Sequence, residues 1–288
     1  MDYLRLVAIL ELNELSRLAI TTMRSVSLVA TSFAGLLALS GLAGCSSVPV
    51  TGRPAVNLVS DASVAKMSAE AFDQMKHEHK ISKNVKMNDT LQRVGSRLAD
   101  VVFWDVPTTT DWEFVVFEAP GEVNAFAMAG GKVGVFSGVF DVATTDAELA
   151  VILAHEIAHV AAKHVHEKLS EQMMMDTGGY VLGAATGGLT GLAVYQIYNM
   201  GSGMVGLSFD RKKESEADHI GLIYMAKAGY DPQAAIDLWE KMDQLQSGKS
   251  VPPEWLSTHP SNADRITRIY GWMPEAKAAY EKAKASHL

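Results

Sequence analysis

The chain has 288 residues, of which 48% are hydrophobic and 20% charged, a composition in the range of globular proteins. It excludes collagen-like, coiled-coil and wholly disordered proteins, and the length suits one or two domains. The net charge is −8 without a lysine and arginine cluster, so a nucleic acid is not an expected partner. Cys45 is the single cysteine, so any bound metal needs histidine and carboxylate ligands.

The first 44 residues have the pattern of a secretory signal. Residues 26–44 carry no charge, follow Arg24 and lead into Leu-Ala-Gly-Cys at 42–45. This end resembles the bacterial lipobox, in which Cys45 becomes the lipidated first residue of the mature protein. A membrane-spanning anchor is the alternative interpretation, because the uncharged run nearly spans a bilayer. Acidic residues before Arg24 are unusual in such a signal and suggest that Met23 is the true start.

The predicted domain organisation follows from this signal. Residues 1–44 are expected to be removed, residues 45–60 to form a lipidated tether rich in proline and glycine, and residues 61–288 to form the folded domain. Ser46 follows the cysteine, and resemblance to sorted lipoproteins then implies the periplasmic face of the outer membrane. The negative charge does not favour an anionic lipid surface, so the lipid itself is the expected anchor.

Periodicity predicts the elements of the domain in chain order. Apolar residues at helical spacing predict helices over 62–75 and 91–102. Alternation then predicts strands over 111–117, 124–128 and 132–136, the last two joined as a hairpin. Further helices are predicted from Asp146 to about 175 and from about 211 to Gly229. The expected fold class is α+β, mainly helical with a small antiparallel sheet.

Residues 177–209 form a separate feature, because none of them is charged and glycine is frequent among them. Small residues allow close helix packing, which favours a buried core or a cover over the active site. Contact with a membrane or a substrate is the alternative, since large apolar surfaces mark interaction sites.

The key motif is His155-Glu156-Ile157-Ala158-His159 within the third predicted helix. Histidines four residues apart lie on one helix face and can bind one metal ion. Two histidines and a glutamate buried in an apolar helix without a metal would be costly. We therefore interpret the motif as a metal site, with Glu156 beside the ion.

A catalytic zinc needs a third protein ligand and one open position. Ala162 stands where the metzincin pattern has glycine, so that class is excluded. Glu167 and Glu171 lie too far along the predicted helix to return to the motif. A second helix must supply the ligand, and Glu214 and Asp218 share one face of it, one to bind zinc and one to orient a ligand imidazole. Glu216 is expected to point elsewhere, and an ordinary solvated helix start is the alternative.

These motifs together resemble the CAAX prenyl protease and HtpX-like zinc metallopeptidases, metallopeptidase family forty-eight. The resemblance covers most of residues 48–270 and implies a gluzincin-type domain. The lipobox and Thr51-Gly52-Arg53 make the chain similar to the family's periplasmic lipoprotein branch, such as LoiP. The motifs that carry the resemblance are HEIAH at 155–159, ESEAD at 214–218, Asn124-Ala125-Phe126-Ala127 with Gly130-Gly131, and STHP at 257–260 with Arg265.

The resemblance implies a role for each site residue. His155, His159 and Glu214 would bind one zinc ion per chain, Glu156 would be the catalytic base, and Asp218 would assist catalysis as the carboxylate behind a ligand.

Residues outside these two helices would complete the catalytic site. His259 would either stabilise the tetrahedral intermediate or bind zinc as a fourth ligand that latches the enzyme. Arg265 would support His259 or a substrate carbonyl. His164 fits a frequent downstream histidine of the family, for which a structural hydrogen bond is the expected role.

Substrate is expected to add to residues 124–128 as an extra strand, with main-chain hydrogen bonds to Asn124, Ala125, Phe126 and Ala127. A purely structural hairpin is the alternative. The predicted function is a zinc endopeptidase that hydrolyses misfolded or damaged periplasmic and outer-membrane proteins. The alternative is a chaperone-like assembly factor for outer-membrane proteins with a latched protease site.

Overall fold

The structure is a computed structural model that describes residues 45–106, 108, 111–175, 209–247, 259 and 263–286. The predicted signal peptide and residues 177–208 of the uncharged stretch lie outside this described part. Apart from Cys45, the described residues belong to one compact unit, Ser46–Leu288.

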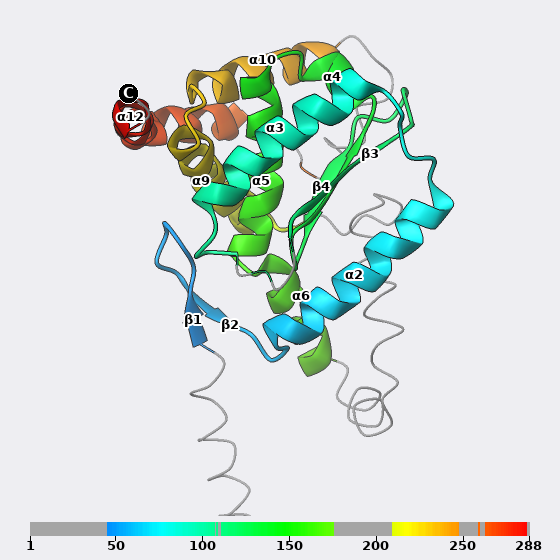
Figure 1. Ribbon diagram of the computed structural model, residues 1–288. Coiled ribbons are helices and arrows are strands. Elements are labelled where there is room, and N and C mark those ends of the chain that lie inside the picture. Colours follow the sequence, from blue (N-terminus) through cyan, green and yellow to red (C-terminus); the bar gives the residue numbers. More distant parts are fainter. Residues whose placement is uncertain are drawn as a thin grey trace, which may run out of the picture. The chain divides into compact units, whose positions relative to one another are not determined.

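The domain is mainly helical, which confirms the α+β fold class (Figure 1). Its helices are α2 (Asp61–Glu78), α3 (Val85–Val101), α4 (Val139–Val142), α5 (Asp146–Ala161), α6 (His164–Met175), α9 (Arg211–Lys227), α10 (Gln233–Ser247) and α12 (Ala263–Ser286). Its strands are β1 (Cys45–Ser47), β2 (Pro54–Val56), β3 (Glu113–Phe117), β4 (Ala125–Met128) and β5 (Lys132–Phe136).

The three-stranded sheet has the order β3-β5-β4 and is mixed rather than antiparallel throughout. The predicted hairpin is present, because β4 pairs antiparallel with β5, and Gly130 and Gly131 at its turn have φ values of 80° and 76°. β3 pairs with β5 in parallel, from Glu113 opposite Lys132 onwards. Alternating hydrophobicity is the same in both kinds of pairing, so it predicts the strands but not their direction. The arrangement leaves β4 at one edge.

Helix α5 lies at the centre of the domain and packs against α9, β4, α3 and α10 (Figure 1). It begins with a capping box, in which the Thr145 hydroxyl accepts from the Glu148 N–H and the Glu148 carboxylate accepts from the Thr145 N–H. Gly221 of α9 lets the two helices approach closely, because a Cβ there would lie 2.9 Å from the backbone nitrogen of His155. The close contact places the motif helix beside the helix predicted to supply the third ligand.

The predicted long helix from Asp146 to about 175 is interrupted, so that part of the prediction is wrong. α5 ends at Ala161, Lys163 adopts a left-handed φ of 57°, and α6 begins at His164. The Lys163 ammonium donates 2.9 Å hydrogen bonds to the Asp61 carboxylate at the start of α2. This long-range ion pair links the break to α2, and the break gives His164 a direction that a continuous helix would not.

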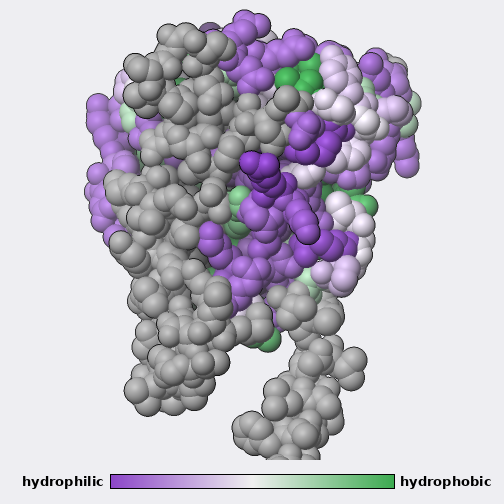
Figure 2. Space-filling view, turned by 180° about the vertical axis from the view of Figure 1, so that it is seen from behind, coloured by the Kyte–Doolittle hydropathy of each residue, from purple (hydrophilic) through white to green (hydrophobic). Residues whose placement is uncertain are grey.

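The predicted tether is partly folded onto the domain. β1 and β2 form a two-stranded sheet, and Val48 and Ala55 are buried in the main hydrophobic core. Among the described residues, no helix combines the length and the apolar character that crossing a bilayer requires. The described part of the face in Figure 2 is mostly hydrophilic, with small separate hydrophobic spots. This part of the face therefore offers no broad apolar surface for a client protein.

Candidate metal centre

Four buried side chains meet between α5, α9 and the carboxyl-terminal part of the chain. The ligand atoms of His155, His159, Glu214 and His259 all lie within 4.8 Å of one another. The Nε2 atoms of the two α5 histidines are 3.1 Å apart, and each lies 3.5 Å from a Glu214 oxygen. The structure thus brings together the HExxH histidines and the glutamate expected from a second helix.

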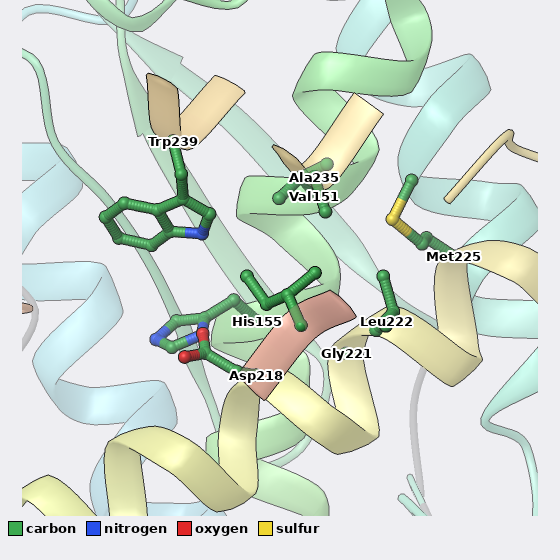
Figure 3. A pocket seen from close by; sticks show the side chains of 9 residues that line it. Val151, His155, Asp218, Gly221, Leu222, Met225, Ala235 and Trp239 are labelled. Atoms are coloured by element: carbon green, nitrogen blue, oxygen red, sulfur yellow. The ribbon is translucent and has the colours of Figure 1, made fainter. Parts of the chain in front are cut away.

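Outer hydrogen bonds decide which ring nitrogens face the centre. The Nδ1–H of His155 donates to Asp218 at 3.0 Å, and Figure 3 shows these side chains facing each other across α5 and α9. His159 Nδ1 lies 2.8 Å from Nδ1 of His164. Because the Nε2–H of His164 donates to the Glu216 carboxylate, its Nδ1 is the acceptor and His159 Nδ1 is the donor. When both rings are neutral, both Nε2 atoms present lone pairs to the same point, an arrangement that a shared metal ion would satisfy. The donor set, two imidazoles and a carboxylate with another imidazole nearby, suits zinc.

Arg265 supports the centre from behind. Its side chain is 2% exposed, and its guanidinium donates to Asp218 at 2.6 Å and to the His259 carbonyl at 3.3 Å and stacks 3.7 Å from the Trp239 ring centre. Asp218 and Trp239 also line a cavity of about 20 Å³ with mostly apolar walls (Figure 3). The structure thus shows the contact of Arg265 with His259, and its contact with a substrate carbonyl stays a prediction.

His159 has its own support, which the motif analysis did not assign. His164 lies at 0% side-chain exposure between His159 and Glu216, and its Nε2 is 3.1 Å from the Glu216 carboxylate. Glu216 does point away from the ligand cluster, as expected, but it holds the histidine behind His159. Phe209, the last residue of the uncharged stretch, stacks on the His159 ring at 4.3 Å between centroids. No sequence motif marks this phenylalanine.

The contacts within the centre shift the pKa values of its ligands. Burial lowers the pKa of His155, but the carboxylates of Asp218 and Glu214 outweigh it and raise the pKa to about 9. Burial raises the pKa of Glu214, yet the surrounding histidines lower it well below its usual range. Zinc ligands must be deprotonated, so metal binding at neutral pH displaces a proton from His155.

Glu156 lies next to the ligands and is buried. Its Oε1 is 3.4 Å from Nε2 of His259, whose Nδ1 lies 3.0 Å from both Glu214 oxygens and 3.2 Å from Nε2 of His155. His259 therefore contacts both the metal ligands and the expected base.

The expected substrate strand also lies close to the motif helix. β4 is an edge of the three-stranded sheet as described and packs against α5. Within it Ala125 and Phe126 are buried and Ala127 is half-buried. The buried Asn124 precedes it, accepts through Oδ1 from the Ala125 N–H and through its carbonyl from the Phe136 N–H. These contacts fix the backbone where an added strand would pair.

Comparison with known proteins decides the family. A model of the peptidase family M48 matches residues 86–273, which include the whole α5 and α9 pair. The chain belongs to peptidase family M48. Membership of this family confirms the predicted metallopeptidase and its zinc. The buried cluster of histidines and glutamate is able to hold that ion.

Named relatives agree on a protease. The M48 peptidase is 34% identical over 240 residues to the mitochondrial metalloendopeptidase OMA1 of Schizosaccharomyces pombe, covering 83% of this chain and 70% of that protein. Its match to OMA1 of Saccharomyces cerevisiae is 34% identical and covers 68% of this chain and 54% of the relative. The beta-barrel assembly-enhancing protease of Escherichia coli is 33% identical over 151 residues, covering 50% of this chain and 31% of that protein. This chain is accordingly a metalloendopeptidase, and it spans only part of these relatives.

Proposed function

We propose that this M48 peptidase is a zinc endopeptidase of the cell envelope that cleaves misfolded or damaged periplasmic and outer-membrane proteins. The observation that carries the proposal is the buried set of His155, His159 and Glu214 with Glu156 on the same helix. The lipobox-like residues 42–45 and the relatives named beta-barrel assembly-enhancing proteases support the envelope location.

The proposal gives each residue of this set a catalytic role. His155, His159 and Glu214 hold the metal, and Asp218 fixes the His155 ring through its Nδ1–H. Zinc, when bound, supplies a Lewis acid that polarises the scissile carbonyl and lowers the pKa of water. Glu156 takes the proton of the attacking water and passes it to the departing amine.

The substrate chain adds to the edge of β4 that faces away from β5. The backbone of Ala125 and Ala127, which alternate with the residues that bond to β5, holds any extended segment without a demand on its sequence. A folded protein does not offer such a segment, so the preferred substrates are unfolded chains. Cys45 carries the lipid that keeps the domain at the periplasmic face of the outer membrane.

The proposal is tested with a small outer-membrane β-barrel protein offered in two forms. The urea-unfolded protein, diluted into buffer, is expected to be cleaved by the zinc-loaded peptidase, and the same protein folded in detergent micelles is expected to be spared. In cell fractions, the wild type is expected in the outer membrane, whereas Cys45→Ser lacks the lipid and is expected to stay out of the outer membrane. Equal cleavage of both forms would contradict the substrate class, and Cys45→Ser in the outer membrane would contradict the lipid anchor.

The position of His259 favours a second candidate, an assembly factor whose protease site is mostly latched. A catalytic zinc keeps one position open, whereas His259 lies among the ligands and also contacts Glu156. A fourth ligand at this place would exclude the attacking water and engage the base. Of the two predicted roles of His259, this contact set supports the latch.

Removing the His259 imidazole separates the two roles by the sign of the effect. If the latch leaves about a tenth of the molecules open, His259→Ala is expected to raise peptide cleavage about tenfold. If His259 stabilises the transition state, the same variant is expected to lose about 10²-fold. The measurement is kcat/KM on an unfolded protein at equal zinc content, and a loss would contradict the latch.

A further inference from the structure

The two ligand histidines are supported in different ways. Behind His155 lie Asp218 and Arg265, both buried within the domain. Behind His159 lies a longer chain of contacts, through His164 and Glu216, that ends in the turn between β1 and β2. This turn immediately follows the proposed lipidation site.

The turn is a defined structure. Val48 donates to the Arg53 carbonyl at 2.8 Å, and Gly52 donates to the Val48 carbonyl at 2.9 Å. Val50 and Gly52 adopt left-handed φ values of 65° and 68°. With Val48 buried in the core, this geometry fixes the backbone from which Thr51 and Arg53 project.

Arg53 and Thr51 bind both oxygens of the Glu216 carboxylate. Thr51 Oγ1 donates to Oε1 at 2.6 Å, and Arg53 Nε donates to Oε2 at 2.8 Å. The other arm of the Arg53 guanidinium donates to Glu167 of α6 at 2.7 and 3.1 Å. Arg53 therefore joins α6 to α9 at a place where its own side chain is 36% exposed and both carboxylates are nearly buried.

From Glu216 the hydrogen bonds continue inward through His164 to His159, and each has a defined donor and acceptor. Glu216 accepts from Thr51 on Oε1 and from the Arg53 guanidinium on Oε2, so its carboxylate is paired with a cation and is an acceptor only. It accepts the Nε2–H of His164, which leaves Nδ1 of His164 as the acceptor for the Nδ1–H of His159. His159 is thereby held in the tautomer whose Nε2 lone pair faces the metal centre.

We infer that Arg53 is a positioning residue for the metal site, which acts through Glu216 and His164 on His159, so that docking of the β1–β2 turn sets the affinity for zinc. The inference rests on the proposed function in one respect, the role of His159 as a metal ligand. If Arg53 is removed, Glu216 loses its charged partner and can turn towards solvent. His164 then loses the acceptor that fixes its tautomer.

The test is the zinc affinity of the full-length protein, measured by competition with a chelating dye. Arg53→Ala is expected to weaken zinc binding about tenfold, at the lower end of the effect of removing an outer-shell partner. Arg53→Lys is expected to recover part of this loss, because an ammonium can bind Glu216 but cannot also hold Glu167 bidentately. At saturating zinc the KM for a peptide is expected to stay unchanged.

Arg93→Ala is the matched control, because it removes another short, bidentate arginine–carboxylate pair, to Asp146, at 2.7 Å. Arg93→Ala is expected to keep the wild-type zinc affinity. Wild-type zinc affinity in Arg53→Ala, or an equal loss in Arg93→Ala, would overturn the inference. His159→Ala separates the two proposals: if it binds zinc like the wild type, the proposed metal site fails, whereas if it alone loses zinc, only the role of Arg53 fails.

Discussion

Replacing Glu156 by glutamine is expected to lower the rate of peptide cleavage about 10³-fold while zinc stays bound. Glutamine has nearly the same shape, but its amide cannot take the proton of the attacking water or return it to the leaving amine. General acid–base catalysis contributes about 10²–10⁴-fold, and here one carboxylate performs both transfers. The ligand set of His155, His159 and Glu214 is untouched. The measurement is kcat/KM on an unfolded protein together with the zinc content of the same sample.

Two variants complete this experiment. Glu171→Gln changes an exposed carboxylate of α6 that pairs with Lys213, and it is expected to behave as the wild type. Glu214→Gln is expected to lose activity together with zinc, because it removes a charged ligand. Cleavage by Glu156→Gln at the wild-type rate would show that another group is the base, and loss of zinc from it would show that Glu156 is itself needed for binding.

The centre of the site follows from local sequence patterns. Helical spacing places His155 and His159 on one face of α5 and Glu214 and Asp218 on one face of α9. Two metal ligands inside one apolar helix need a third ligand from another element, and Gly221 allows a second helix to approach closely. These relations depend on periodicity and on burial, which a single sequence carries.

The support of His159 depends on features that periodicity does not contain. The helix break at Lys163 has neither glycine nor proline, and Ala161, Ala162 and Lys163 are good helix formers. The side chain of Lys163 forms a tertiary ion pair with Asp61. A continuous helix, as predicted, would not bring His164 between His159 and Glu216.

The contacts of Arg53 and Phe209 are likewise tertiary. Arg53 and Glu216 are 163 residues apart in the chain, and the turn that carries Arg53 has the composition of a loop or tether. Phe209 ends an uncharged stretch whose composition fits either a core or a membrane contact. Neither residue type has a spacing that marks it as part of a metal site, so only the folded chain identifies them.

Neutralising Asp218 is expected to have the largest effect on stability. In Asp218→Asn the guanidinium of Arg265 stays buried without its 2.6 Å carboxylate partner, and the remaining carboxylate, Glu214, is 3.6 Å away. Breaking a buried ion pair in this way lowers the free energy of unfolding by about 3 kcal/mol or more. Zinc affinity is expected to fall about 10- to 100-fold as well, because the amide can present its NH₂ group to His155 and permit the wrong tautomer. Urea unfolding of the metal-free protein and dye competition measure the two effects.

The double variant Asp218→Asn with Arg265→Met shows that the two losses have different causes. Methionine removes the guanidinium that has lost its short carboxylate contact, and it still packs on Trp239. Most of the lost unfolding free energy is therefore expected to return. Zinc affinity is expected to stay low, because His155 still lacks a carboxylate acceptor on Nδ1. Arg265→Met is measured alone as well. If the losses of unfolding free energy of Asp218→Asn and Arg265→Met add up to the loss in the double variant, Arg265 and Asp218 do not stabilise the fold as a pair. If zinc affinity returns with stability, Asp218 acts on the metal only through the packing of the domain and not through the orientation of His155.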